Sequence, residues 1–243
     1  MSWIALLLAF APLVIVPLGL RVLGMPPPLP FTLATVAPLV SLLLPVGPAA
    51  GAIATIWFAA CAAITVGPAL AWLRRPRWDA GLVALAYLCV GAGWLVMSRA
   101  GVRVSGFGPT IVELTAVHFH YAGFAALVLA ARHTVAAALV AGGTVLVAVG
   151  HFGTHELDVA GAAALTAGLL ALGWSTWRTT THPLLRISAA TPVVSMALAL
   201  AYALGRIDVG PSVPIDDMAR FHGTLNAFGF ALAGLVGRLL VAR

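Results

Sequence analysis

The sequence contains no lysine and few charged residues of any kind. All thirteen residues counted as lysine or arginine are arginine, which excludes a lysine Schiff base and therefore a retinal pigment of the usual kind or a pyridoxal enzyme. Charged residues make up 8% of the chain and hydrophobic residues 62%, whereas a soluble domain has roughly 25% charged residues. The two cysteines, Cys61 and Cys89, lie inside apolar runs and are expected to be small buried hydrophobic residues.

Apolar runs of membrane-spanning length recur from end to end, with no polar stretch long enough for a soluble domain. The sequence therefore predicts an all-α fold, a polytopic transmembrane helical bundle that forms one integral membrane domain over residues 1–243. About nine spans are expected, with eight as the alternative, and the first is expected to be retained rather than cleaved as a signal peptide. No internal repeat is evident, which argues against an inverted-repeat transporter. The expected spans are 3–20, 31–45, 49–72, 80–98, 110–131, 134–153, 158–176, 187–204 and 218–240.

The arginines predict the orientation, because positive charge collects on the cytoplasmic side of membrane proteins. With the N-terminus outside and the C-terminus inside, nine arginines fall on the inner side and four on the outer side. The high pI does not indicate nucleic-acid binding, since single arginines at span ends act as membrane anchors. We therefore expect a multi-pass protein of the cell membrane, in contact with membrane lipid. The inner arginines are Arg21, Arg74, Arg75, Arg77, Arg132, Arg178, Arg186, Arg238 and Arg243, and the outer ones are Arg99, Arg103, Arg206 and Arg220.

The fifth expected span carries an unusual density of ionisable groups. Glu113, His118, His120 and Tyr121 fall within nine residues, although ionisable groups inside a membrane are costly and usually functional. Glu113 and His120 are seven residues apart, so a helix places them two turns apart on one face. Hydrogen bonds that only join helices are the simpler explanation, but they need one or two polar groups rather than four.

Histidines are also expected to gather at one depth. In the predicted orientation, five of the seven lie in the outer half of the membrane, which suggests one shared pocket there: His118, His120, His151, His155 and His222. In the ninth span, Met218, His222 and Asn226 recur at i, i+4 and i+8 on one helix face. The remaining two, His133 and His182, are expected to be solvated in inner loops.

Two strings of residues resemble a known family. The segment Glu113-Leu-Thr-Ala-Val-His-Phe-His-Tyr-Ala-Gly-Phe124, together with Phe221-His-Gly-Thr-Leu-Asn-Ala-Phe-Gly-Phe230, resembles the YndJ-like bacterial integral membrane proteins. The resemblance covers mainly the C-terminal half. It implies a polytopic membrane protein and no particular mechanism, although such proteins are sometimes labelled transporters. By size and number of spans, the chain is also similar to the small membrane-embedded terpene cyclases of meroterpenoid pathways, without a matching motif.

The favoured function is acid–base chemistry on a lipophilic substrate without a cofactor. An apolar pocket favours the neutral form of a carboxyl group, so Glu113 is the expected proton donor, with His118 and His120 as its orienting partner or the terminal base. His222 and Asn226 would bond to this constellation or to the polar end of the substrate. Cyclisation (a lyase reaction) or isomerisation of a prenyl or terpenoid chain would use these parts, and Glu113→Gln should then abolish turnover.

Aromatic faces could stabilise a transient carbocation in such a pocket. The candidates are Phe119, Tyr121, Trp94 and Phe228, although each one singly is more often an ordinary core or lipid contact. Asp216 and Asp217 are further candidates for proton donation to the substrate. Two adjacent aspartates before a span more often cap its helix.

Two other functions stay open. The pair His151 and His155, at i and i+4, could offer two ligands to zinc, copper or a haem, completed by His118, His120 or His222. In that metalloenzyme, Glu113 would activate a bound water. The third possibility is a proton-coupled transporter in which the same groups relay protons, and the scarcity of acidic residues deep in other spans argues against it.

Overall fold

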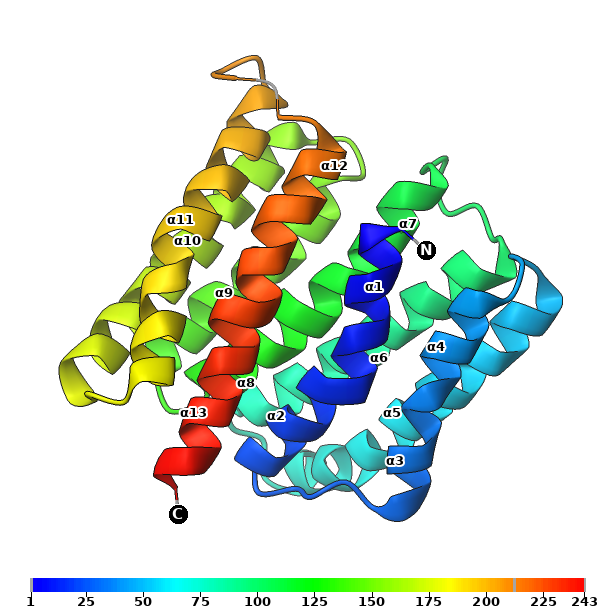
Figure 1. Ribbon diagram of the computed structural model, residues 1–243, viewed down its shortest axis with the longest axis horizontal. Helices are drawn as coiled ribbons and strands as arrows, with labels where there is room; N and C mark the ends of the chain where they lie inside the picture. Colours follow the sequence, from blue (N-terminus) through cyan, green and yellow to red (C-terminus); the bar gives the residue numbers. More distant parts are fainter. Residues whose placement is uncertain (1, 212, 243) are drawn as a thin grey trace. The chain divides into compact units, whose positions relative to one another are not determined.

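The computed structural model describes residues 2–211 and 213–242, and within these ranges the chain is helical or in turns, with no strand (Figure 1). This confirms the all-α prediction. All nine expected segments occur as apolar helical stretches, and seven of them are long and apolar enough to cross a membrane. The two shorter ones, Leu29–Leu43 and Thr134–Gly150, are the second and sixth predicted spans. Orientation stays a prediction; Arg243, counted there as inner, lies outside the described residues.

The chain divides into two compact units, Met1–Val128 and Leu129–Arg243. The boundary falls inside one short helix, α8 (Ala126–Ala130).

In the first unit, the helices that follow one another in sequence mostly pack against one another (Figure 1). Helix α6 is central and contacts α5, α7 and the π-helical turn η2, while α1 packs on α7 and α4. The elements are α1 (Trp3–Phe10), η1 (Ala11–Ile15), α2 (Val16–Val22), α3 (Leu29–Ala34), α4 (Val36–Leu43), α5 (Pro48–Arg74), α6 (Ala80–Ala100), α7 (Pro109–His118) and η2 (Phe119–Ala125).

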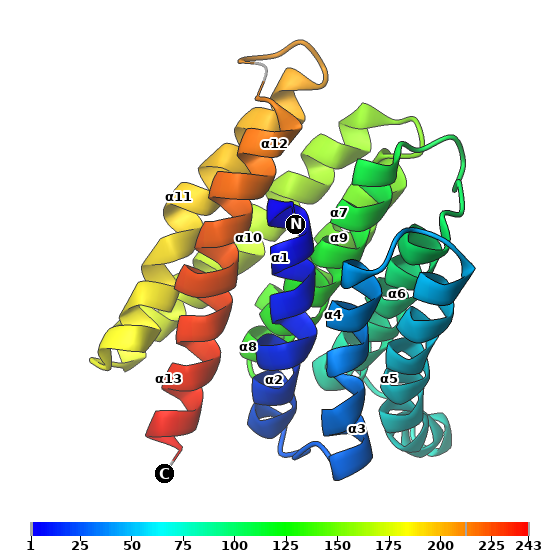
Figure 2. The ribbon, with the colours of Figure 1, turned by 45° about the vertical axis from the view of Figure 1, so that its right-hand side comes forward.

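In the second unit, α10 lies between α9 and α11, and α11 packs along the last helical segment, as both ribbon views show (Figure 2). Glycines let α9 and α10 approach backbone to backbone: a Cβ on Gly161 would lie 2.6 Å from the nitrogen of Val147, and one on Gly143 would lie 2.8 Å from the oxygen of Gly161. The elements are α9 (Thr134–Gly150), α10 (His155–Thr179), α11 (Pro183–Gly205), α12 (Ile215–Asp217), η3 (Met218–His222), η4 (Leu225–Leu232) and α13 (Ala233–Val241).

Familiar chemistry sets the helix ends. Proline occupies the first helical position of α5, α7 and α11, where its missing N–H costs nothing. The Asp79 carboxylate caps α6 by accepting from the N–H groups of Gly81 and Leu82 at 2.9 and 3.1 Å. Gly101 ends the same helix at φ 74°, a left-handed conformation that glycine adopts without strain.

Candidate functional site

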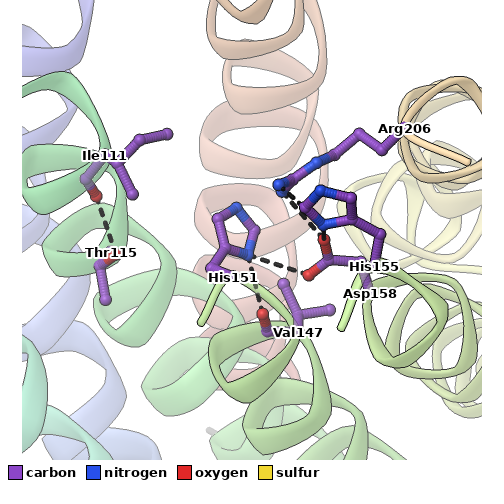
Figure 3. Close-up of polar contacts among 7 residues, drawn as sticks. All are labelled: Ile111, Thr115, Val147, His151, His155, Asp158 and Arg206. Atoms are coloured by element: carbon purple, nitrogen blue, oxygen red, sulfur yellow. Dashed lines mark hydrogen bonds and ion pairs between the residues drawn. The ribbon is translucent and has the colours of Figure 1, made fainter. Parts of the chain in front are cut away.

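A buried carboxylate gathers three basic side chains at one end of the second unit (Figure 3). The Asp158 side chain is 4% exposed, and its Oδ2 lies 2.9 Å from Nη1 of Arg206. Its Oδ1 lies 3.0 Å from Nδ1 of His151, and Oδ2 lies 3.7 Å from Nδ1 of His155. A buried carboxylate is stable only if its negative charge is compensated, and here the guanidinium of Arg206 compensates the charge of Asp158.

Local structure explains why these side chains converge. His151 is the C-cap of α9, while His155 and Asp158 lie in the first turn of α10. A helix N-terminus favours negative charge and a C-terminus favours positive charge, so the short turn between the two helices suits this arrangement. Gly150 leaves the necessary room, because a Cβ there would lie 2.5 Å from the backbone nitrogen of Asp158 and closer still to its carboxylate.

The contacts of His151 fix which of its nitrogens carries the proton. Nδ1 lies 2.8 Å from the carbonyl oxygen of Val147, as Figure 3 shows, and a carbonyl can only accept. Nδ1 therefore carries hydrogen in the neutral ring, and Nε2 is the basic nitrogen. The side chain is 22% exposed, so a proton can be exchanged there. Asp158 lies within ion-pair distance of this nitrogen, although neither of its carboxylate oxygens accepts a hydrogen bond from the described residues.

His155 has the opposite tautomer. Nη2 of Arg206 donates to Nδ1 of His155 at 3.0 Å, and because the guanidinium can only donate, this nitrogen accepts. His151 and His155 thus lie near the same carboxylate, but the neutral ring of His151 carries its hydrogen on Nδ1 and that of His155 carries it on Nε2.

Glu113, the predicted acid, lies in the first unit against an arginine. Its Oε1 is 3.9 Å from Nη1 of Arg99, a side chain that is 6% exposed. Arg99 also donates from Nε to the carbonyl of Ser41 at 3.1 Å and from Nη2 to that of Leu44 at 2.7 Å. This cluster ties the end of α4 to α6 and α7. Deeper in α7, Thr115 merely bonds its own helix by donating to the carbonyl of Ile111 at 2.8 Å (Figure 3).

His120 is fully buried and both of its nitrogens are occupied. Nδ1 lies 2.8 Å from the carbonyl oxygen of Ala116, and Nε2 accepts from the indole N–H of Trp57 at 3.1 Å. Gly91 makes room for the ring, since a Cβ there would lie 2.8 Å from Nδ1. His118 is half-buried with its ring edge-on to Phe119, at 6.0 Å between centroids. His120 thus joins helices by hydrogen bonds, the simpler of the two roles that its sequence context allows.

The structure brings His222 and Asn226 together, as their spacing predicts. His222 Nδ1 lies 2.7 Å from the carbonyl of Ser195, so Nδ1 donates and Nε2 accepts from the amide of Asn226 at 3.0 Å. The Ser195 hydroxyl in turn donates to Oδ1 of Asn226 at 3.0 Å. This network is closed within the second unit. The shared pocket that would join His222 to Glu113 spans both units and stays a prediction.

The four aromatic candidates differ in their surroundings. Tyr121 is buried and its hydroxyl donates to the carbonyl of Leu7 at 3.1 Å, while Phe119 packs edge-on against Tyr87. Trp94 is half-buried, and Phe228 is 42% exposed on its helix. Phe119 and Tyr121 therefore fill packing space in the first unit.

The sequence matches a known protein family. The model of the YndJ-like proteins matches residues 6–230. The chain belongs to the YndJ-like family. It is also 28% identical over 181 residues to "Uncharacterized membrane protein YndJ" of Bacillus subtilis (strain 168), covering 68% of this chain and 33% of that relative. The chain therefore spans about a third of the length of this curated relative. No solved structure matches.

The comparison confirms the family predicted from two strings, and the match extends well beyond the C-terminal half. The chain is a multi-pass membrane protein, as its relative and its apolar helices both indicate. Both YndJ-like strings contain π-helical turns: η2 begins within the first, and η3 and η4 overlap the second. Such turns often occur at functional sites, and here they carry His120, His222 and Asn226.

The other predicted residues lie where helices begin. Asp216 and Asp217 are exposed in the first turn of the last helix, where negative charge suits the helix N-terminus. His133 and His182 each precede the first residue of a helix, and both residues are partly exposed to solvent. Among residues 2–211 and 213–242, no group of three or more His, Cys, Asp or Glu side chains is arranged to hold a metal ion.

Sequence reasoning missed four partners that decide what these groups do: Trp57, Arg99, Ser195 and Arg206. A signal existed for the two arginines, since each stands alone at the end of an apolar run and precedes a long loop. A signal also existed for Asp158, because it follows His155 by three positions on a helix, a spacing that places the two side chains on one face. Nothing in the local sequence marks Trp57 or Ser195, because their partners come from distant helices.

Proposed function

We propose that this YndJ-like protein is a membrane enzyme that performs acid–base chemistry on a lipophilic substrate, with His151 as the proton-transfer group. One observation carries the proposal: Nδ1 of His151 is held between the carbonyl of Val147 and the carboxylate of Asp158. Of the histidines described above, His120 and His222 have both nitrogens engaged, so neither can take a proton without breaking its network.

Each group in the cluster has a distinct task. His151 Nε2 takes a proton from the substrate, and Asp158, 3.0 Å from Nδ1, stabilises the imidazolium that forms. Arg206, at 2.9 Å, fixes the carboxylate, and it donates to His155 at the same time. The imidazolium can return its proton to another carbon, which completes an isomerisation without any cofactor.

Isomerisation of a prenyl or terpenoid chain uses this site more fully than cyclisation does. Cyclisation also needs aromatic faces around a carbocation, and Phe119 and Tyr121 are engaged in packing within the first unit. The half-exposed position of His151 and His155, at the end of apolar helices, supports a substrate with a long apolar part and a reactive end.

The test is hydrogen exchange into lipid. The purified protein in nanodiscs is incubated in D₂O with a bacterial lipid extract that contains prenyl lipids, and the lipids are analysed by mass spectrometry. Proton abstraction and return leave solvent deuterium at carbon, so labelled lipid is expected with the wild type and is expected to fall at least about 100-fold in His151→Gln.

Two further variants make the test decisive. His182→Gln changes a histidine outside the cluster and should retain the label. Glu113→Gln separates this proposal from the expectation that Glu113 is the acid, because it should also retain the label. Labelling that survives in His151→Gln but disappears in Glu113→Gln would overturn the assignment and restore the site in the first unit.

A further inference from the structure

The other end of the second unit, far along the same helices from Asp158, contains a small cleft with a largely apolar lining. It lies between the end of α8, the last turns of α10 and α13, and the beginning of α11. Leu129, Leu172, Leu185 and Phe230 form its walls, and Arg238 stands among them. Thr176 and Ser188 also line the cleft, but a guanidinium in such a largely apolar wall is costly unless an anion compensates it.

The walls have little polar character of their own. Ser188 lines the cleft, but its hydroxyl donates to the carbonyl of Phe230 at 2.8 Å. Gly173 keeps α10 and α11 close, because a Cβ there would lie 2.5 Å from the carbonyl oxygen of Ala189. The surface is thus suited to a hydrocarbon chain and offers one charged group.

Two further basic side chains lie near Arg238. Arg132 lies close enough to Arg238 for the two charges to repel. Burial, and then the charge of Arg238, lower the pKa of His133 in the turn before α9. None of the ion pairs found in the described part of the chain includes any of these three residues. An anion would relieve this repulsion.

Two arginine–tryptophan pairs mark the same end of the unit. The Arg178 guanidinium lies 5.7 Å from the ring centre of Trp174, and that of Arg186 lies 5.0 Å from Trp177. Trp174 is 66% exposed and Trp177 is 45% exposed. Exposed tryptophans and arginines gather at the level of the lipid headgroups, so we infer that the cleft lies near that level.

We propose that this cleft binds an anionic glycerophospholipid, with its phosphate on Arg238 and Arg132 and one acyl chain along the leucine wall. The charge of the site, the apolar wall beside it and its position near the aromatic pairs all match this ligand, as basic pockets between membrane helices do elsewhere. The inference does not depend on the proposed acid–base activity.

Lipid titration of the delipidated protein tests the proposal. Phosphatidylglycerol or phosphatidylcholine is added to the 243-residue chain in detergent, and bound lipid is counted by native mass spectrometry. Phosphatidylglycerol should bind preferentially. Each basic residue near the headgroup contributes about 1 kcal/mol, so Arg132→Gln and Arg238→Gln should each weaken its binding about fivefold.

Controls separate the alternatives. Arg103→Gln removes an exposed arginine from the loop between α6 and α7 and should leave binding unchanged. Arg132 is exposed, so its variant tests the site even if Arg238→Gln does not fold. Equal binding of phosphatidylcholine, unchanged affinity in Arg132→Gln, or full competition by inorganic phosphate at equal concentration would overturn the proposal.

Discussion

The two units contain the same succession of four helical segments. In the first unit, α3–α4, α5, α6 and α7 with η2 follow the opening helix; in the second, the order is α9, α10, α11 and α12–α13. The first segment is short in both sets. The third ends at an arginine, Arg99 or Arg206, and the fourth contains a π-helical turn with the sequence Gly-Phe-Ala, at 123–125 and 229–231.

Arg99 and Arg206 each join helix ends, but they do so with different partners. Arg99 donates to the backbone carbonyls of Ser41 and Leu44, which cannot change their charge, and meets Glu113 only at 3.9 Å. Arg206 contacts Asp158 and His155, which can. An arginine that ties helix ends together therefore serves structure in one unit and holds ionisable groups in the other, which is why we place the chemistry in the second.

The largest difference is expected when each arginine loses its acid. Asp158→Asn leaves Arg206 without its carboxylate and should lower the free energy of unfolding by about 3 kcal/mol, because breaking a buried pair leaves an uncompensated charge. Glu113→Gln should cost below about 1 kcal/mol, since Arg99 keeps both carbonyls and the ion pair is long. Denaturant unfolding of both variants in one detergent measures this. A larger loss in Glu113→Gln would reverse the comparison.

Gly150→Ala should be the next most damaging change. The added Cβ overlaps the carboxylate and backbone nitrogen of Asp158, and such overpacking costs about 2 kcal/mol. Gly142 lies on the same helix, and a Cβ added there would have nothing within 4 Å. Gly142→Ala is therefore the matched control and should stabilise α9 by up to about 1 kcal/mol. Equal melting temperatures for the two variants would show that Asp158 is not held tightly.

The histidine networks of the π-helical turns differ in burial. Trp57→Phe leaves Nε2 of the fully buried His120 without its donor, which should cost about 1.5 kcal/mol. Asn226→Leu removes the equivalent donor from the half-buried His222, where water can replace it, so the loss should be nearer about 0.5 kcal/mol. Thermal unfolding of the two variants gives the order, and the reverse order would mean that His222 is the more tightly held ring.

Much of the fold follows from composition, because apolar length alone identifies helices that cross a membrane. The seven long apolar helices were predictable for this reason, as was the contact between His222 and Asn226, which lie one turn apart on a single helix. The recurrence of four helices was not predictable. It is visible in the helix lengths and in a few residues such as Arg99 and Arg206. The apolar residues between them differ, because one apolar side chain can replace another in a membrane helix.

The candidate site was harder to predict because its meaning depends on partners from other helices. Five histidines look equivalent in the sequence, yet Trp57 and Ser195 occupy His120 and His222, whereas Val147 and Asp158 leave Nε2 of His151 basic. Only tertiary structure separates a histidine that joins helices from one that can transfer a proton.

The smallest effect on stability is expected from the turns that precede α3 and α9, the first helices of the two sets of four. Residues 24–28 contain no ionisable side chain, whereas the turn before α9 contains His133, whose pKa is lowered by burial and then by the charge of Arg238. Below the ordinary histidine pKa of about 6.5, the unfolded chain therefore binds the proton more readily than the folded one. Stability should fall as the pH drops through that value.

The expected loss of stability at low pH comes from His133, so substituting this residue should remove it. His133→Gln should flatten the decline in unfolding midpoint between about pH 7.5 and about pH 5, because glutamine does not titrate in that range. His182→Gln, in the turn between α10 and α11, provides the control and should leave the decline due to His133 in place. Anionic lipid bound near Arg238 would favour the protonated ring, so added phosphatidylglycerol should also reduce the decline in the wild type but not in His133→Gln. A decline unaltered by His133→Gln would mean that the pH dependence of stability arises elsewhere in the chain. The turns before α3 and α9 would then not differ in their contribution to it.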